Sequence, residues 1–333
     1  EWSEGLMRKR ISYSSKLIVL SLILIMMSPF TFAADKEDKS PSDASEERPV
    51  VLTTDAQIQR AKIRVDEQQA PYYQSWNLTT NAADLALTQT YFPEQKENHS
   101  EYGKLGRSHG QDVRSLALAY LITGDEPYFD KARTILTDWA ADALANPNHP
   151  SAGSPHSAGL ALSGVMTIFT DGYALLWRDL EEHDRQLIEA WFRKSLDPIR
   201  ESREIWETAD EICVYGECSW WGAPWLDKQE FNNHLSAQNL ALTAIGFALR
   251  DEEVIREAMD SQDNPRNLMT LISGAILMDD EDIYYKDWTI TRGAPSVEPG
   301  EIYDRYRVSS GNGLSYAHLH LRLLTLLAEI ADN

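Results

Sequence analysis

The sequence predicts an all-α protein, an incomplete (α/α) toroid of antiparallel helical hairpins. After Val50, apolar residues recur at helical spacing, and strand-like alternation is scarce. Two stretches, Leu116–Asp125 and Leu240–Asp251, share one pattern: an apolar helix, a tight polar turn, and then an acidic amphipathic helix. Apolar first helices and more polar second ones suit an inner and an outer ring. Stacked solenoid repeats are the alternative, but the spacing is too irregular to favour them.

The helical periodicity marks eight segments along the chain. They are Val113–Thr123, Tyr128–Leu144, Ala158–Trp177, Asp184–Ser195, Asn239–Leu249, Glu253–Met259, Leu268–Leu277 and Leu314–Ile330.

The first residues have the pattern of a secretory signal peptide. Basic residues at 8–10 precede an apolar stretch from Leu17 to Met27, and the small pair Ala33-Ala34 follows. Met7 is the natural initiator, so residues 1–33 are expected to be upstream residues and signal peptide. The apolar stretch is too short to favour spanning a bilayer. We therefore expect a periplasmic or secreted protein that leaves the membrane after signal cleavage.

The next segment is a flexible acidic lead-in at residues 34–49, rich in Asp, Glu, Lys, Ser and Pro. The folded part is expected to begin near Val50. No second linker follows, so residues 50–333 are predicted to form a single domain with a large core. The sequence gives no signal for the oligomeric state.

The charge of the chain limits its partners. Fifty-two acidic residues against thirty-one basic ones give a net charge of −21, which argues against nucleic acid, because phosphate binding needs a basic face. A polyanionic substrate would need a local cluster of Arg, Lys and His. The acidity also fits a simple role in solubility and salt tolerance.

The only two cysteines, Cys213 and Cys218, stand five positions apart in the sequence. In an oxidising compartment a small loop disulfide is the default expectation. Two cysteines without further nearby ligands are a weak zinc signal.

Three predicted loops look unlike simple connections: Tyr91–Asp112, Asn146–His156 and Ile212–Glu230. The third contains Trp220 and Trp221, whose ring faces suit stacking on sugars. The alternative is that these tryptophans close the core beneath the loop.

The segment Asn232-Asn233-His234 directly follows the tryptophan-rich loop and opens a helix. Asn is a good N-cap, so one interpretation is a helix cap with a surface histidine. The other is a site, favoured by the aromatic loop before it and by Tyr316 and His318 near the start of the last helix.

At this point the chain resembles the alginate lyase superfamily. The resemblance rests on Asn232-Asn233-His234, on the downstream Glu301, Arg305 or Arg307, and on Tyr316 in Gly-Leu-Ser-Tyr-Ala-His-Leu-His. The hairpin from Ala119 to Trp139 adds to it, so it covers most of the mature chain. The stretch between the arginines and Tyr316 is longer and richer in glycine than in the best-known alginate lyases.

The resemblance implies an (α/α) toroid and β-elimination of a 4-O-linked uronate, with an acidic polysaccharide as partner and no cofactor. Asn233 and Arg307 would neutralise the uronate carboxylate, where charge accumulates. Tyr316 would move the proton, with His234 as helper or alternative base. Asn232, Arg305, Glu301 and His318 would contact substrate.

Further substrate-binding candidates stand in the first predicted loop, in Gly-Arg-Ser-His-Gly-Gln-Asp. They are Arg107, His109 and Gln111, placed just before the helix expected at Val113. The alternative for His109 is a histidine that orders its own turn.

Three rival functions remain open. A glycoside hydrolase on the same fold would use two carboxylates, for which the candidates are Asp210, Glu211, Glu298 and Glu301. A non-catalytic glycan-binding protein would keep the fold without the reaction. A metalloenzyme is a distant third, because the histidines lack paired His-x-x-x-His spacing.

Overall fold

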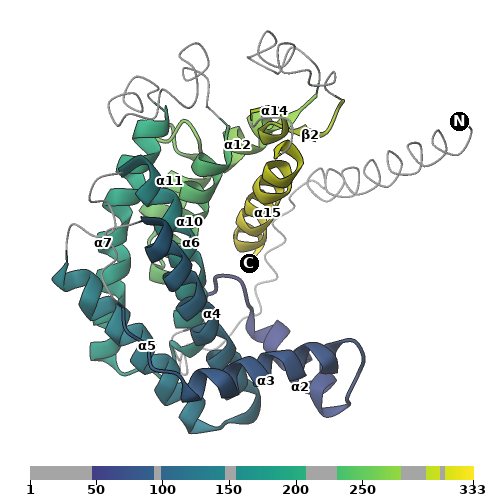
Figure 1. Cartoon of the computed structure of the whole chain (residues 1–333), viewed down its shortest axis with the longest axis vertical. Coiled ribbons are helices and arrows are strands. Elements are labelled where there is room, and N and C mark those ends of the chain that lie inside the picture. The colour runs from purple at the N-terminus through teal and green to yellow at the C-terminus, as the bar shows by residue number, and fades with distance from the viewer. Residues whose placement is uncertain (1–46, 94–98, 147–154, 208–230, 279–297, 308–311) are drawn as a thin grey trace, which may run out of the picture.

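The computed structural model describes residues 47–93, 99–146, 155–207, 231–278, 298–307 and 312–333. Over these ranges the chain is almost entirely helical, which confirms the predicted all-α class. Figure 1 shows the helices as an arc, with α2 and α3 at one end, α15 at the other, and an open side between them. This is an incomplete (α/α) toroid. The predicted signal peptide and the loop Ile212–Glu230 lie outside the described residues.

The elements follow one another in chain order. They are α2 (Asp55–Asp66), α3 (Tyr72–Thr88), α4 (His99–Thr123), α5 (Glu126–Ala145), α6 (Pro155–Leu176), α7 (Glu182–Glu207), α10 (Asn233–Leu249), α11 (Glu252–Asp260), α12 (Leu268–Ala275), β1 (Ile276–Leu277), β2 (Glu301–Ile302), α14 (Asp304–Arg307) and α15 (Gly313–Asp332).

The helices form two layers. In the inner layer α4 packs on α6, α6 on α10, and α10 on α15, while α5, α7 and α11 cover these helices from outside. Both repeated stretches are hairpins, as predicted: the first joins α4 to α5 and the second joins α10 to α11. In the second hairpin Arg250 takes the left-handed conformation at φ 52°, and the Asp251 side chain accepts from the backbone N–H groups of Glu253 and Val254.

Aromatic side chains fill the space between the layers. Trp139 of α5, Phe169 of α6 and Trp191 of α7 are all at most 1% exposed. Their ring centroids lie 5.1–6.2 Å apart, within the range of favourable aromatic pairs. Three helices distant in sequence are therefore joined by one cluster.

The helix α6 is apolar on all sides because it lies at the centre of this arrangement. By length and composition it could cross a membrane, but 83% of its most apolar window is buried inside the protein. That burial is the environment of a core helix.

Helix α4 begins fourteen residues earlier than the sequence predicted, at His99 and not at Val113. The predicted loop Tyr91–Asp112 is therefore wrong over most of its length. Glycines are typical of loops, but those at 103, 106 and 110 are points where α4 packs closely on α6. A Cβ on Gly106 would lie 2.5 Å from a methyl group of Val165. Small residues are required there by packing, not by a turn.

Helix α7 also runs further than predicted, to Glu207 and not to Ser195. Pro198 lies inside it, where a proline removes one backbone hydrogen bond. The turns after Pro198 carry Ile199, Ile205 and Trp206, which are at most 3% exposed. Burial of these apolar side chains outweighs the loss of one backbone hydrogen bond.

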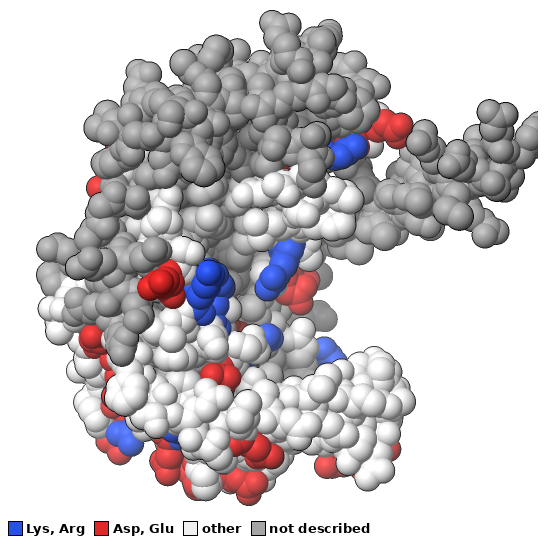
Figure 2. Space-filling model, in the orientation of Figure 1, with Lys and Arg blue, Asp and Glu red and all other residues white. Residues whose placement is uncertain are grey.

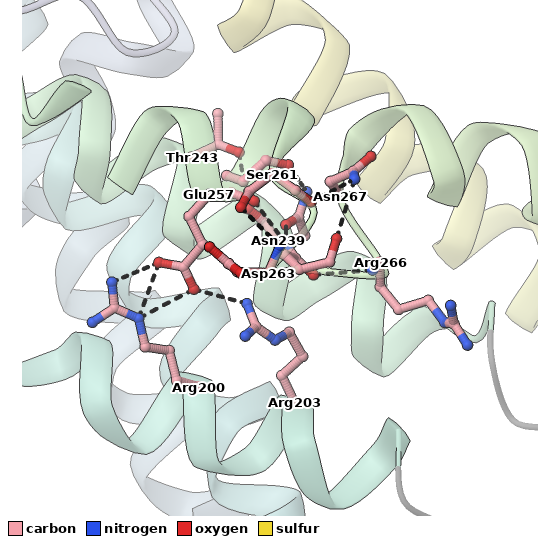
Figure 3. Close-up of polar contacts among 11 residues, drawn as sticks. Arg200, Arg203, Asn239, Thr243, Glu257, Ser261, Asp263, Arg266 and Asn267 are labelled. Carbon is pink, nitrogen blue, oxygen red and sulfur yellow. Dashed lines mark hydrogen bonds and ion pairs between the residues drawn. The ribbon is translucent and has the colours of Figure 1, made fainter. Parts of the chain in front are cut away.

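An ion-pair cluster joins the outer helices α7 and α11. Figure 3 shows Glu257 of α11 between Arg200 and Arg203 of α7. The Glu257 carboxylate accepts from Arg200 Nη2 at 2.6 Å and from Arg203 Nη1 at 2.9 Å. Burial raises the pKa of Glu257, but the hydrogen bonds and charges of the two arginines outweigh it, and the pKa is lowered.

The N-terminal segment is anchored to the far end of α6. Arg48 is 6% exposed and donates to the backbone carbonyls of Thr53 and Ala174 and to Asp55. The packed part of the chain thus includes Arg48, two residues before Val50, where we expected it to begin.

The sequence analysis did not anticipate α2, α3 or the short elements before the last helix. The strands β1 and β2 pair antiparallel, with Ile276 opposite Ile302. This pairing brings α14 and its first residue, Asp304, against α15 and the start of α10.

Candidate active site at the start of α10

The side chain of Asn232 caps α10, as predicted. Its Oδ1 accepts from the backbone N–H of His234 at 2.8 Å and of Leu235 at 3.2 Å. Asn232 is fully buried and Asn233 is 1% exposed, so this cap is not a surface feature. A buried asparagine cap fixes the direction of the first turn.

The carboxylate of Asp304, from α14, also holds this turn. Its Oδ2 accepts from the backbone N–H of Asn233 at 2.7 Å. Asp304 is fully buried, and a buried carboxylate needs such donors. Two neighbouring N–H groups at the start of α10 are thus bound by side chains from two separate segments.

A histidine of α15 completes a buried polar chain. His320 Nδ1 lies 3.2 Å from Asp304 Oδ2, and His320 Nε2 lies 2.6 Å from Ser236 Oγ of α10. Both His320 and Ser236 are fully buried. The last helix is therefore connected to the first turn of α10 through Asp304 and Ser236.

The imidazole of His234 lies against the indole of Trp206, near the end of α7. The ring centroids are 4.0 Å apart and the planes are inclined by 31°. His234 is only partly exposed. The ring orientation of this histidine is thus set by a neighbouring helix.

Tyr316 stands in the first turns of α15, and its backbone N–H donates to the Asn312 carbonyl at 3.0 Å. Its side chain is half-buried. Tyr316 lies four residues before His320, hence on the same side of α15, whereas His234 lies two residues before Ser236. The hydrogen bond between Ser236 and His320 thus joins the two turns that carry the predicted pair.

Of the two arginines predicted for the site, the structure describes the side chain of Arg305 but not that of Arg307. Arg305 Nε donates to Glu301 Oε1 at 3.0 Å, and both side chains are partly exposed. Arg307 is the last residue of α14, and its side chain is not among those described. The choice between the two arginines therefore stays a prediction.

The three candidates on α4 do not form one cluster. Residues two apart on a helix point in different directions, and Arg107 and His109 do so here. His109 is 9% exposed, and its Nδ1 accepts from Trp139 Nε1 at 3.0 Å. Burial lowers its pKa. Its place in the core was missed because the segment was interpreted as a loop.

Arg107 and Gln111 lie on the exposed side of α4. The Arg107 side chain follows α6, where a Cβ on Gly164 would come within 3.2 Å of its Cδ. Burial, and then the charge of Arg322 on α15, lower the pKa of Arg107. Positive charges on α4 and α15, two helices distant in sequence, therefore influence each other.

His318 is exposed on α15 and lines a shallow groove with Leu321, Arg322, Thr325 and Leu326. Figure 2 shows a hollow between α15 and the α2–α3 arm, with several Lys and Arg side chains on its wall beside a few acidic ones. Acidic side chains predominate along the lower edge of the same view. The net negative charge is therefore unevenly distributed.

Several predicted residues lie outside the described part of the chain. They are Trp220, Trp221, Cys213 and Cys218, so stacking on sugars and the disulfide stay predictions. Within the described ranges no group of three or more His, Cys, Asp or Glu side chains is arranged to hold a metal ion.

Four residues of this site were missed by the sequence analysis: Trp206, Ser236, Asp304 and His320. Only His320 carried a usable signal, because it follows Tyr316 by one helical turn. Asp304 stands in a charged run, Asp-Arg-Tyr-Arg, that is typical of a solvated surface, and its burial depends on the strand pairing before it.

Comparison with known proteins adds a family to this geometry. Two solved structures are similar to the chain: alginate lyase A1-III from Sphingomonas species A1, and a variant of alginate lyase A1-III complexed with a tetrasaccharide. Each is 16% identical with a TM-score of 0.47; the alignments cover 83% of this chain and 69% and 68% of the other chains. No curated protein sequence matches the chain.

A family model described as alginate lyase matches residues 37–270, which is more than half of the chain and includes the start of α10. The predicted resemblance to the alginate lyase family is confirmed by this match, which includes Asn232-Asn233-His234 and ends before Tyr316. The chain belongs to the alginate lyase family and is a polysaccharide lyase.

Proposed function

We propose that this lyase cleaves a 1,4-linked polyuronate by β-elimination, with mannuronate-rich alginate as its first substrate and glucuronan as its second. The observation that carries the proposal is the buried clamp on the first turn of α10. It holds Asn233 and His234 on one side and, through His320, the helix of Tyr316 on the other.

The reaction requires removal of the proton on C5 of the uronate, a poor acid because the adjacent carboxylate is negative. The amide of Asn233, aided by an arginine, would donate hydrogen bonds to that carboxylate and stabilise the charge that it gains. Arg307 is our first choice and Arg305 our second, because Arg305 is paired with Glu301.

Tyr316, as the phenolate, would take the C5 proton, after which the C4–O4 bond breaks and its electrons leave with O4. The electron pair of the C5–H bond becomes the C4=C5 double bond, and Tyr316 returns its proton to O4. In mannuronate and glucuronate the C5 proton and O4 lie on the same face of the ring, so one tyrosine suffices. In guluronate they lie on opposite faces, and His234 would be the base.

The charge distribution supports an anionic substrate. The chain carries a net charge of −21, yet Lys and Arg side chains face the hollow between α15 and the α2–α3 arm. A local basic wall can attract a polyanion to a protein that is acidic overall. We further propose that the signal-like segment at residues 1–33 exports the protein to the periplasm or the medium, where such glycans occur.

The test is incubation with poly-mannuronate, glucuronan, guluronate blocks and chondroitin, followed by near-ultraviolet absorbance. Only elimination leaves a 4,5-unsaturated uronate that absorbs there. Release of reducing sugar without absorbance would instead identify a hydrolase and refute the proposal.

Replacement of the tyrosine separates a lyase from a glycan-binding protein. Tyr316→Phe should abolish turnover while the substrate still binds, because only the phenolic proton acceptor is lost. The matched control is Tyr128→Phe, since Tyr128 of α5 donates to Asp84 of α3 at 2.6 Å. Equal activity of both variants would remove Tyr316 from the reaction.

A further inference from the structure

The buried chain of Ser236, His320 and Asp304 has the connectivity of a catalytic triad. A serine hydroxyl contacts one imidazole nitrogen, and a carboxylate lies near the other. In a serine hydrolase the hydroxyl must reach the substrate. All three residues here are fully buried, so the Ser236 hydroxyl cannot reach a glycan. The role of these three residues must therefore lie within the structure of the protein.

The polar contacts of His320 and Asp304 connect both to α10. His320 Nδ1 lies 3.2 Å from Asp304 Oδ2, although the two atoms are not aligned for a hydrogen bond, and His320 Nε2 shares a hydrogen bond with the Ser236 hydroxyl at 2.6 Å. Asp304 Oδ2 also accepts from the backbone N–H of Asn233 at 2.7 Å. Of the two residues beside His320, Asp304 thus binds the first turn of α10 and Ser236 belongs to it.

The same residues lie next to the groups proposed for the reaction. Asp304 binds the peptide of Asn233, Ser236 follows His234 by two residues, and His320 follows Tyr316 by four. A rotation or shift of α15 along α10 would break the 2.6 Å contact between Ser236 and His320. It would also move Tyr316 relative to Asn233 and His234.

We propose that Asp304 and His320 are positioning residues, which fix the register of α15 on α10 and so place Tyr316 opposite Asn233 and His234. This inference rests on the proposed elimination reaction. It assigns a role to two side chains that never touch the substrate. Displacements of about 1 Å in such a site can reduce the rate about 100-fold.

The test compares two replacements of Asp304. Asp304→Ala removes the acceptor for the Asn233 N–H and the carboxylate beside His320, and we expect kcat to fall about 100-fold with KM changed less than about threefold. Asp304→Asn keeps the size and removes only the charge, because an amide oxygen in the place of Oδ2 still accepts from Asn233 and still lies beside His320 Nδ1. We expect this conservative variant to restore kcat to within about tenfold of the wild type.

Activity is measured on poly-mannuronate below the melting temperature of each variant, with the folded fraction taken from circular dichroism. Should Asp304→Ala not fold, Ser236→Ala carries the test, with kcat expected to fall about fivefold or more. Its control is Thr243→Val, which removes another buried hydroxyl of α10, one that donates to the Asn239 carbonyl at 2.9 Å. That control should leave kcat unchanged.

The outcomes separate the two proposals. A wild-type chain that releases no unsaturated product overturns both. An active wild type whose folded Asp304→Ala or Ser236→Ala variant keeps the wild-type kcat overturns the positioning role alone. A fall in kcat for Thr243→Val equal to that for Ser236→Ala also overturns it, because loss of packing would then explain the effect.

Discussion

The indole of Trp206 packs on the imidazole of His234, with ring centroids 4.0 Å apart and planes inclined by 31°. Trp206 is 2% exposed and comes from the last turn of α7. The outer helix α7 thus supports a residue of the inner helix α10. The part of α7 beyond Pro198 provides this contact, since a helix ending at Ser195 would not reach His234.

Replacement of this tryptophan should affect rate and stability together. In Trp206→Phe the smaller ring leaves His234 free to turn, and we expect kcat to fall about tenfold or more. The lost volume should also lower the free energy of unfolding by about 1–3 kcal/mol. Steady-state kinetics and urea unfolding measure the two effects.

The control for this prediction is Trp191→Phe, the same change in the aromatic cluster of the core. It should lower stability by a similar amount and leave kcat near the wild-type value. If both variants lose activity in proportion to their stability, the contact between Trp206 and His234 has no specific role in the reaction.

Glu257 should make stability depend on pH. Because its pKa is lowered in the folded protein, its ionised form stabilises the fold at neutral pH, and this contribution is lost as the pH falls through that lowered pKa. We expect Glu257→Gln to lower the free energy of unfolding by about 1–3 kcal/mol at pH 7, with the difference shrinking from about pH 5 downward.

Thermal unfolding of wild type and variant between pH 3 and pH 7 measures this difference. Glu329→Gln, at an exposed position of α15, is the control and should stay within about 0.5 kcal/mol of the wild type at every pH. A difference for Glu257→Gln that is constant with pH would show that shape, and not ionisation, explains its effect.

The contact between α4 and α6 should tolerate one added methyl group and reject another. In Gly106→Ala the new Cβ meets a Val165 methyl group at 2.5 Å, and we expect a loss of about 1–3 kcal/mol. In Gly164→Ala the nearest atoms belong to the flexible Arg107 side chain, at 3.2 Å. Helix propensity there offsets the contact, so stability should change by less than about 1 kcal/mol. Equal losses would contradict the close packing.

The hairpins were predictable because they depend on local signals. The apolar periodicity of α5, α6, α10 and α15 and the polar turn at Arg250-Asp251 are contained in short stretches of sequence. The start of α4 was not predictable from local signals. Considered alone, Gly103, Gly106 and Gly110 favour a turn, but next to α6 they allow a close contact between helices. That difference depends on residues about sixty positions away.

Some features of the site were likewise predictable from local sequence, and others were not. Asn232 was predictable as a cap, because capping involves only its own helix. The roles of Asp304 and Trp206 depend on contacts between residues 71 and 28 positions apart, for which one sequence contains no local pattern. The prediction of His109 as a substrate-binding residue followed from the error in α4. Because the segment was expected to be a loop, the sequence could not assign His109 to the buried side of a helix.

Arg107 should contribute to binding of an anionic substrate more than to turnover. Its side chain lies on the exposed side of α4, and its pKa is lowered by burial and by the charge of Arg322, so an anion beside it would relieve that repulsion. We expect Arg107→Gln to raise KM for poly-mannuronate about tenfold or more, the value of one charge-assisted hydrogen bond, with kcat changed less than about threefold.

The control for Arg107 is Arg114→Gln, on the same helix. Arg114 is already neutralised, because its Nε lies 2.7 Å from Asp171, a carboxylate that is 1% exposed. This variant should lose stability but keep its KM. Added salt should raise KM of the wild type more than that of Arg107→Gln, since mobile ions screen the attraction that the variant lacks. Equal KM values for the two variants would place the substrate away from this side of α4.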